Sequence, residues 1–275
     1  MISIDTLRYD YLSIVNPDNV STPNLDGFAK NSIFFEYAFT TCPLTSPAHA
    51  SVFTGLYPKD NGIRENLSGK IKPEIKTLAE VLKENGFKTY AFVSSSTLSR
   101  DYGFSKGFDV YDDNFSPCSK FKKCFLPNRS GENTISILKQ KINLDSKFFL
   151  FLHIFEPHFP YEPPQPFKEK YKNNLYAGEV AYSDFLIGEF LKYLKEKNLF
   201  RNSIICIFSD HGEGLYEHNE PTHGYLTYNS TLRVPLMLYY PSSKFEKKSY
   251  PVSLIDLFPT FLDLLEIKSI ENLPG

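Results

Sequence analysis

The stretch Ser203-Ile204-Ile205-Cys206-Ile207-Phe208-Ser209-Asp210-His211-Gly212-Glu213 sets an apolar run directly before a carboxylate, an imidazole and a glycine turn. A short apolar run that ends on polar residues is typical of a buried parallel strand whose carboxyl end opens on a ligand site. Four further runs share this character and are predicted as strands: Met1 to Ile4, Lys88 to Val93, Phe148 to Ile154 and Val234 to Tyr240.

Helical patterns lie between these runs. Thr77 and Glu80 have the spacing of a capping box, and they predict a helix from Thr77 to Asn85. Thr22-Pro23 predicts another helix start, because a cap residue is followed by proline in the first turn. Longer patterns cover residues 177–197 and 255–264. The alternation predicts a single α/β domain over residues 1–275, with a mostly parallel central sheet and helices on both faces.

The charge balance restricts the partners. With 30 basic and 32 acidic residues, the chain has no excess charge that would favour nucleic acid or an anionic membrane. The longest apolar stretch, Phe148 to Phe155, is too short to cross a bilayer. We therefore expect a small-molecule partner, no nucleic acid and no membrane segment in this chain.

The cysteines and the chain ends give less information about the cellular compartment. Cys118 and Cys124 could form a disulfide in an oxidising compartment or remain free, whereas Cys206 lies in an apolar run and is predicted to be core. Both ends look clipped, so a leader or membrane anchor could precede this sequence. The localisation stays open between a soluble, periplasmic, extracellular and membrane-anchored protein.

Polar residues follow three of the predicted strands. Asp5 comes after the first, His153 and His158 lie at and just after the third, and Asp210-His211 follow the fourth. Because the carboxyl ends of parallel strands meet at one edge of a sheet, we expect these side chains to converge there. Adjacent carboxylate and imidazole groups suit zinc, manganese or calcium. The alternative is a helix cap at Asp210 beside a surface histidine.

Thr45 is the candidate nucleophile. It precedes Pro47 and a helical pattern, so its hydroxyl should lie at a helix amino terminus, where free backbone N–H groups attract anions. A cation in contact would activate a hydroxyl that is otherwise a poor nucleophile. A simple helix cap is the alternative.

These residues resemble the sulfatase family of the alkaline-phosphatase superfamily. The motifs occur in the family's order over nearly the whole chain: Ile4-Asp5-Thr6-Leu7-Arg8, Thr22-Pro23-Asn24-Leu25-Asp26, Thr45-Ser46-Pro47-Ala48-His49, Thr54-Gly55-Leu56-Tyr57-Pro58, the segment His153 to Pro160, Asp210-His211-Gly212-Glu213, Glu217-His218 and Thr222-His223-Gly224. The resemblance implies an alkaline-phosphatase-like fold and hydrolysis of an ester.

The same resemblance implies roles for single residues. Asp5, Asp210 and His211 would bind one divalent metal, or two, together with the hydroxyl of Thr45. Arg8 and His49 would steady the nucleophile, and His158 and His223 would contact the transferred group or protonate the leaving oxygen. Asn66 and His153 would contact the substrate. His153 could equally be a satisfied core histidine.

The chain departs from the family at three positions. Most sulfatases have a cysteine, converted to formylglycine, where this chain has Thr45, and an arginine where it has His49. Asp5 is followed by Thr6 rather than by a second acid. We therefore expect no formylglycine and fewer carboxylate ligands than usual.

The chemistry of threonine favours phosphorus over sulfur. A formylglycine hydrate can eliminate sulfate, but a threonine ester lacks the second hydroxyl, so water must attack the central atom of the intermediate. The sequence thus predicts a hydrolase of phosphate or sulfate esters. A membrane-associated phosphoethanolamine or phosphoglycerol transferase and an inactive binding module remain alternatives.

Three other segments carry weaker expectations. Residues Ser94 to Arg129 are predicted as a long excursion over the mouth of the site, and Lys244 to Lys248 as a solvated turn. Tyr161 could line the pocket, and Glu217 and His218 are expected in a solvated loop.

Overall fold

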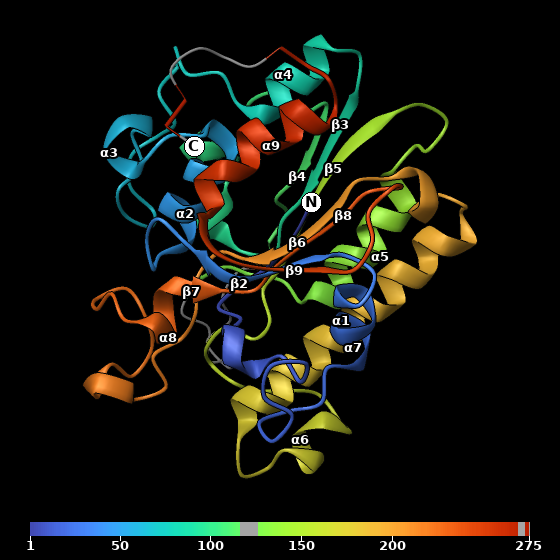
Figure 1. The fold of residues 1–275 in the computed structure, drawn as a ribbon. Helices are drawn as coiled ribbons and strands as arrows, with labels where there is room; N and C mark the ends of the chain where they lie inside the picture. Colours follow the sequence, from blue (N-terminus) through green and yellow to red (C-terminus); the bar gives the residue numbers. More distant parts are fainter. Residues whose placement is uncertain (116–125, 269–272, 275) are drawn as a thin grey trace.

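The computed structural model describes residues 1–115, 126–268 and 273–274. Within them, nine strands form one sheet that is flanked by helices on both faces (Figure 1). The strand order is β4-β3-β5-β1-β6-β8-β2-β7, and β9 pairs with β2 outside this path. The bounds are β1 Ile2–Ile4, β2 Ile33–Phe39, β3 Lys88–Phe92, β4 Val110–Asp112, β5 Phe148–Ile154, β6 Ile205–Ser209, β7 Arg233–Val234, β8 Leu236–Tyr239 and β9 Glu246–Ser253.

The half of the sheet from β4 to β6 is parallel throughout. β1 lies between β5 and β6, so that Ile4 is opposite Ile154 on one side and Ser209 on the other. β8 then runs antiparallel to β6, and β2 antiparallel to β8. The carboxyl ends of β1, β5 and β6 therefore lie side by side at one edge of the sheet.

Helices cover both faces of this sheet. Their bounds are α1 Pro23–Ala29, α2 Thr45–Thr54, α3 Pro58–Asn61, α4 Leu78–Glu84, α5 Gly131–Lys141, α6 Phe167–Lys170, α7 Leu175–Glu196, α8 Asn229–Leu232 and α9 Leu257–Leu264. Figure 1 shows α1, α5 and α7 together on one face and α2, α4 and α9 on the other, and each group packs on its own apolar core. The predicted mixed α/β arrangement is confirmed.

The helix starts follow from local sequence. The hydroxyl of Thr77 accepts a hydrogen bond from the Glu80 N–H, and the Glu80 carboxylate accepts one from the Thr77 N–H, which is the capping box that the sequence predicts. Thr22 precedes α1 with Pro23 in the first turn, also as predicted. Asn174, which the sequence analysis did not single out, caps α7 by accepting from the Ala177 N–H.

The sequence analysis missed three strands and misjudged two segments. β9 has no continuous apolar pattern because it lies at the margin of the sheet and exposes most of its side chains, and β4 is only three residues long, whereas β2 carries an almost continuous apolar run that the sequence analysis overlooked. The predicted turn at Lys244 to Lys248 is wrong at its end, since Lys247 and Lys248 belong to β9 and pair with β2. The segment Ser94 to Arg129 is no simple excursion either, because it contributes β4 to the sheet.

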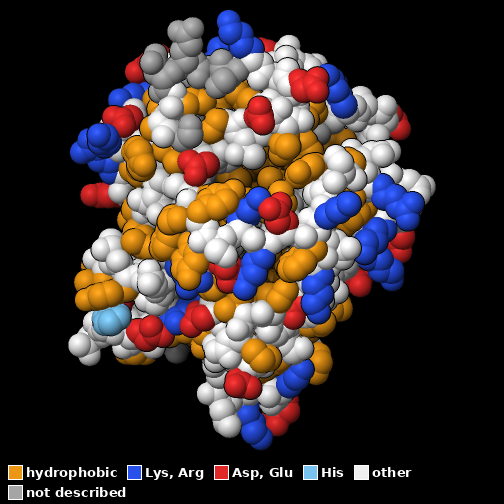
Figure 2. Space-filling model, in the orientation of Figure 1, with side chains coloured by type: hydrophobic (Ala, Val, Ile, Leu, Met, Phe, Trp, Pro, Cys, Tyr) orange, Lys and Arg blue, Asp and Glu red, His pale blue; other side chains and the backbone are white. Residues whose placement is uncertain are grey.

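The remaining expectations concern cysteines and surface. Cys206 is fully buried in β6, as predicted, while Cys118 and Cys124 lie outside the described residues. No helix in the described ranges has both the length and the apolar character that a bilayer crossing requires. Figure 2 shows acidic and basic side chains interspersed over the visible face, in line with the balanced charge of the sequence.

Candidate active site

Three neighbouring strands deliver the polar residues of the site. Asp5 follows β1, His153 is the penultimate residue of β5, and Asp210 follows β6. The register sets Ser3 opposite His153, which brings these side chains to the same level of the sheet. Asp5, His153 and Asp210 are each fully buried. The structure thus brings sequence-distant polar groups together at the predicted edge.

His211 lies at the centre of this group. Its Nε2 is 3.7 Å from Asp5 Oδ1, 3.4 Å from Asp210 Oδ2 and 3.3 Å from the hydroxyl oxygen of Thr45. Its Nδ1 lies 2.9 Å from the carbonyl oxygen of Gly212. Because a carbonyl oxygen only accepts, the proton belongs on Nδ1, and the lone pair of Nε2 faces the two carboxylates.

The donor set fits a divalent cation. Both carboxylate oxygens of Asp5 and the Oδ2 of Asp210 are buried without a hydrogen-bond partner. Orphaned buried carboxylate oxygens are costly unless a cation or a proton satisfies them. Asp5, Asp210 and His211 each offer one ligand atom within 4.8 Å of the others, which is compatible with binding one ion. Oxygen and imidazole donors suit zinc or manganese, and calcium where further oxygens join.

The pKa values of Asp5 and Asp210 are shifted in opposite directions. Burial raises the pKa of Asp210 well above its ordinary value, and the neighbouring charge of Asp5 adds to the effect. Burial alone would raise the pKa of Asp5 as well, but the neighbouring imidazoles, with His153 at 3.4 Å as the foremost, lower it overall. Asp5 is therefore the charged carboxylate, and Asp210 becomes charged only when a cation lies beside it.

His49 and His153 adjoin the same group with different roles. His49 lies in α2 with Nδ1 2.8 Å from the carbonyl oxygen of Thr45 and Nε2 2.8 Å from the hydroxyl of Ser3. Burial lowers the pKa of His49 to about 3, so the ring is neutral. Although His49, His153 and Asp210 form a second cluster of potential ligands, both nitrogens of His49 are already hydrogen-bonded.

His153 touches both the site and the neighbouring strand. Its Nδ1 accepts a hydrogen bond from the Ser94 N–H at 3.4 Å, and its Nε2 lies 3.4 Å from Asp5 Oδ2. An imidazole that accepts at Nδ1 carries its proton on Nε2 and can orient a carboxylate. The structure therefore places His153 behind Asp5, inside the cluster.

Thr45 is the first residue of α2 and is buried. The helix begins at Thr45 as expected, but the backbone N–H groups that follow Thr45 are not free. The Ser46 N–H donates to Asn66 Oδ1, the Ala48 N–H donates to the Leu44 carbonyl, and Pro47 has no N–H. Asn66 thus lies beside the candidate nucleophile, but it steadies the backbone of the first helical turn.

The guanidinium of Arg8 is engaged by acidic residues and a backbone carbonyl. Its guanidinium forms two hydrogen bonds with Asp10, contacts Glu217 at 2.7 Å and donates to the carbonyl oxygen of Glu213 at 3.2 Å. Glu217 is therefore more than a solvated loop residue. The turn before Arg8 is pinned by Tyr176, whose hydroxyl donates to the Thr6 carbonyl and accepts from the Arg8 N–H.

His158 and His223 line up beyond His211. The ring centroids of His211 and His223 are 4.3 Å apart, and those of His223 and His158 are 5.2 Å apart. The Nδ1 of His223 lies 3.2 Å from Glu213 Oε1. Burial opposes protonation of His223, but Glu213 outweighs it and raises the pKa of this histidine, whereas burial lowers the pKa of His158.

Several positioning residues were not found from the sequence. Ser3, Ser94 and Tyr176 hold His49, His153 and the turn at Thr6. Ser3 occupies a strand position that reads as ordinary core, and Tyr176 lies in a helix far along the chain. No spacing signal could have found either of them.

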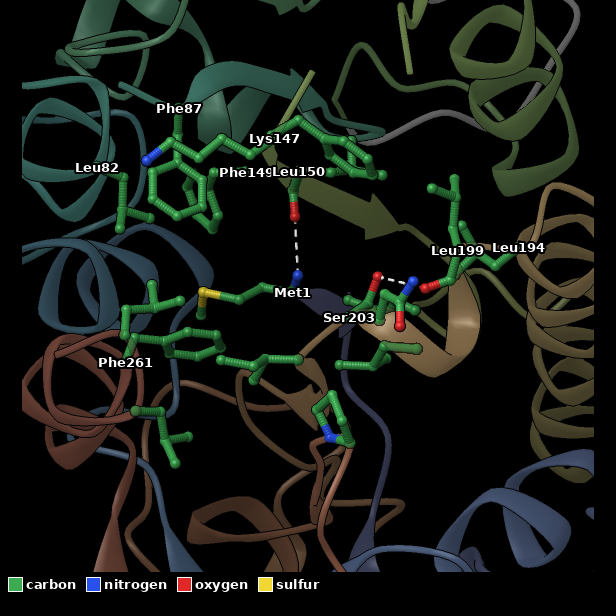
Figure 3. A pocket seen from close by; sticks show the side chains of 18 of the residues that line it. Met1, Leu82, Phe87, Lys147, Phe149, Leu150, Leu194, Leu199, Ser203 and Phe261 are labelled. Atoms are coloured by element: carbon green, nitrogen blue, oxygen red, sulfur yellow. Dashed lines mark hydrogen bonds between the residues drawn. The ribbon is translucent and has the colours of Figure 1, made fainter. Parts of the chain in front are cut away.

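The opposite end of the same strands has another character. A cavity of about 480 Å³ opens there and is lined mainly by apolar side chains, among them Leu82, Phe87, Leu150 and Phe261 (Figure 3). The amino group of Met1 donates a hydrogen bond to the Leu150 carbonyl in this cavity. None of the candidate ligands lines it, so this cavity is separate from the acid-imidazole cluster.

Comparison with known proteins agrees with this geometry. The family model described as Sulfatase matches residues 1–267. An ulvan-active sulfatase of Formosa agariphila is 26% identical over 320 residues, and the match covers 100% of this chain and 62% of that protein. The iduronate 2-sulfatase of Mus musculus is 24% identical over 326 residues, with 88% of this chain and 59% of that protein covered. This chain thus spans about three fifths of the length of both relatives.

Solved structures agree on the fold. A phosphonate monoester hydrolase from Silicibacter pomeroyi superposes with a TM-score of 0.84 at 17% identity, covering 100% of this chain and 74% of that one. A phosphonate monoester hydrolase of Agrobacterium radiobacter gives a TM-score of 0.79 at 18% identity, with 97% and 73% covered. The predicted alkaline-phosphatase-like fold is confirmed.

Proposed function

Because this chain belongs to the sulfatase family, we propose that it is a metal-dependent hydrolase that cleaves a phosphate or sulfate ester through a covalent Thr45 intermediate. One observation carries the proposal. The Thr45 hydroxyl lies 3.3 Å from the Nε2 of His211, beside the orphaned oxygens of Asp5 and Asp210. A hydroxyl buried against an acid-imidazole group is the arrangement that covalent ester hydrolysis needs.

Asp5, Asp210, His211 and the Thr45 hydroxyl would hold the cation, with zinc, manganese and calcium as the candidates and one or two ions as the stoichiometry. A bound cation would lower the pKa of the hydroxyl and offset the negative charge of the ester. Other groups of the protein orient the histidines of the site. The Gly212 carbonyl fixes the tautomer of His211, and Ser3 and the Thr45 carbonyl fix the ring of His49.

The reaction would proceed in two displacements. The Thr45 hydroxyl releases its proton to solvent, its oxygen attacks the phosphorus or sulfur atom, and the bond between that atom and the alcohol oxygen breaks. His223, held by Glu213, is the candidate for protonating the departing alcohol, with His158 next to it as the alternative. Water then attacks the central atom of the threonine ester and restores the hydroxyl.

The identity of the central atom is the finer part of the proposal. Most sulfatases use formylglycine, whereas Thr45 offers a single hydroxyl that cannot eliminate sulfate. This favours phosphorus, and the likeness of the fold to phosphonate monoester hydrolases is compatible with it. The names of the relatives, which include ulvan-active and iduronate sulfatases, support a sulfated sugar as the competing substrate.

The test is an activity panel on the purified chain with aryl phosphate, phosphodiester, phosphonate and sulfate esters. Each ester is assayed with added zinc, manganese or calcium, and elemental analysis identifies the bound metal. We expect turnover that depends on metal, a loss of at least about 10³-fold in Thr45→Ala and partial activity in Thr45→Ser. Full turnover by Thr45→Ala would overturn the nucleophile, and no turnover with any ester would favour an inactive module.

A further inference from the structure

A second, acidic cavity lies beside the candidate active site. It measures about 240 Å³ and shares His158 with the site. This volume is below the ~300–1,000 Å³ of pockets that enclose a whole ligand, so it would hold one end of a substrate. Four carboxylates and two aromatic rings are among its lining residues: Glu132, Glu156, Glu162, Glu179, Phe155 and Tyr182.

Glu179 is the distinctive residue of this cavity. It lies in the first turns of α7 and is only 4% exposed. Its Oε1 accepts a hydrogen bond from the Glu162 N–H at 2.7 Å, whereas its Oε2 is buried without any hydrogen-bond partner. A buried carboxylate oxygen without a partner is costly, and a positively charged ligand would offset that cost.

Three carboxylates of the cavity lack a positively charged partner among the described residues. Within the described part of the chain, Glu132, Glu162 and Glu179 form no ion pair, and the hydroxyl of Tyr182 is the donor that reaches Glu132, at 3.3 Å. Burial first, and then the nearby charges of Glu156 and Glu162, raise the pKa of Glu179 to about 8, so this acid is largely protonated at neutral pH. The exposed carboxylates of Glu132 and Glu162 give the cavity a negative potential, and a bound cation would favour the charged form of Glu179.

An organic cation fits this lining better than a metal ion. A metal needs several ligand atoms close together, and the only such clusters among the described residues are at the acid-imidazole site. The carboxylates of the cavity are too dispersed for that. Aromatic rings next to carboxylates are instead the usual surroundings of ammonium groups, because ring faces attract cations. Phe155 and Tyr182 supply the rings here.

The cavity also lies where the alcohol part of a substrate bound at Thr45 would extend. His158 lines it, and the rings of His223 and His211 follow in sequence toward Thr45. An ester whose phosphorus or sulfur atom lies at Thr45 would therefore direct its alcohol part past His158 into the cavity. The alcohol part is what distinguishes one substrate of this chemistry from another.

We propose that this cavity, the amine subsite, binds a cationic amine on the alcohol part of the substrate, either an aminoalkyl or a quaternary ammonium group. Its role as a subsite rests on the proposed ester hydrolysis, but its binding of a cation does not. Glu179, ionised when the cation binds, would carry the main charge contact, and Glu162 would add an exposed one.

Binding of an unreactive cation tests the subsite without turnover. Calorimetry or NMR titration compares choline with its neutral analogue, in which carbon replaces the nitrogen. At pH 9, where Glu179 is ionised, we expect choline to bind at least about tenfold tighter, and Glu179→Gln to reduce that preference to about twofold or less. Glu196→Gln, an exposed residue at the far end of α7, is the matched control and should keep the full preference.

Two further variants separate the charge of the subsite from a general disturbance of the fold. Glu162→Gln changes an exposed side chain and keeps the backbone N–H that holds Glu179, so it should fold normally and reduce the choline preference about threefold. Thr45→Ala should bind choline as the unaltered protein does. Equal binding of choline and its neutral analogue, or a full preference in both Glu179→Gln and Glu162→Gln, would overturn the subsite.

A kinetic comparison separates this inference from the proposed function. We expect a higher kcat/KM for the choline ester than for the ester of the neutral analogue, and this ratio should fall about tenfold in Glu179→Gln. If choline binds but neither ester is hydrolysed, the cation site stands and the hydrolase proposal fails. If both esters are hydrolysed equally and choline binds no better than its analogue, the hydrolase stands and the amine subsite is wrong.

Discussion

The two ends of β1, β5 and β6 differ although the same three strands form both. At their carboxyl ends, Asp5, His153 and Asp210 are buried with orphaned polar atoms. At their amino ends, the strands open on a mainly apolar cavity whose wall includes Phe261 from α9 (Figure 3).

We infer that the carboxyl ends of these strands serve binding and chemistry, whereas their amino ends stabilise the fold. Burying carboxylates without partners destabilises a fold. Their presence at the carboxyl ends of the strands therefore indicates that binding or catalysis requires charge there. Apolar burial at the other end contributes stability and no chemistry. Changes at the carboxyl end should therefore affect binding and turnover, and changes at the amino end should affect unfolding.

The largest effect is expected for Asp210→Asn. If a site of ~10–16 kcal/mol is shared by four ligands, losing one carboxylate should weaken metal binding about 10²–10³-fold. Stability without metal should be unchanged or higher, because the repulsion between Asp210 and Asp5 is removed. Calorimetric metal titration and urea unfolding measure the two quantities, with the exposed Asp263→Asn as the control. Unchanged metal affinity in Asp210→Asn would break the comparison.

Phe261→Ala should have the reverse profile. Phe261 is 4% exposed in the apolar core, so its truncation should destabilise the fold by about 3–4 kcal/mol. The partly exposed Leu264, one turn on, should lose about 1 kcal/mol when changed to Ala. Turnover per folded molecule should stay the same in both variants. A large loss of turnover without a loss of stability would contradict the division.

Glu179→Gln sharpens the comparison through pH. The pKa of Glu179 is raised from 4.5 to about 8, so the folded state prefers the protonated acid. The stability that this preference contributes is fully present below pH 4.5 and is lost as the pH rises through 8. Relative to the unaltered protein, Glu179→Gln should gain on the order of 3 kcal/mol between pH 5 and pH 9. Urea unfolding at both pH values measures the gain, and a constant difference would mean that Glu179 is not the titrating group.

Tyr176→Phe should have the smallest effect. The variant leaves the Thr6 carbonyl and the Arg8 N–H without their partner, which should cost about 2 kcal/mol. Thr6 has a φ of 55°, so the turn that carries Asp5 depends on such support. We expect a modest fall in both stability and metal affinity. A change in stability alone would show that Tyr176 supports the core and not the site.

The same division explains what the sequence could predict. The central strands were predictable because both faces of β1, β5 and β6 are buried and their sequences are continuously apolar. β9 was not, since its pairing with β2 depends on backbone hydrogen bonds while Lys247 and Lys248 sit in a charged, largely exposed strand. An edge strand of this kind has no apolar signal.

The site divides in a similar way. The convergence of Asp5, Asp210 and His211 follows from parallel topology, which a sequence can reveal. The attachment of Arg8 to Asp10 and Glu217, and the engagement of the Ser46 N–H by Asn66, depend on side-chain directions in loops. Local sequence does not determine such contacts.

The central claim is that Thr45 becomes covalently attached to the transferred group. Its most direct test is to quench the metal-loaded enzyme in acid during turnover and to map the added phosphoryl or sulfuryl group by mass spectrometry. The account predicts the adduct on Thr45, and none in Thr45→Ala. An adduct on a different residue, or multiple turnovers by Thr45→Ala, would contradict it.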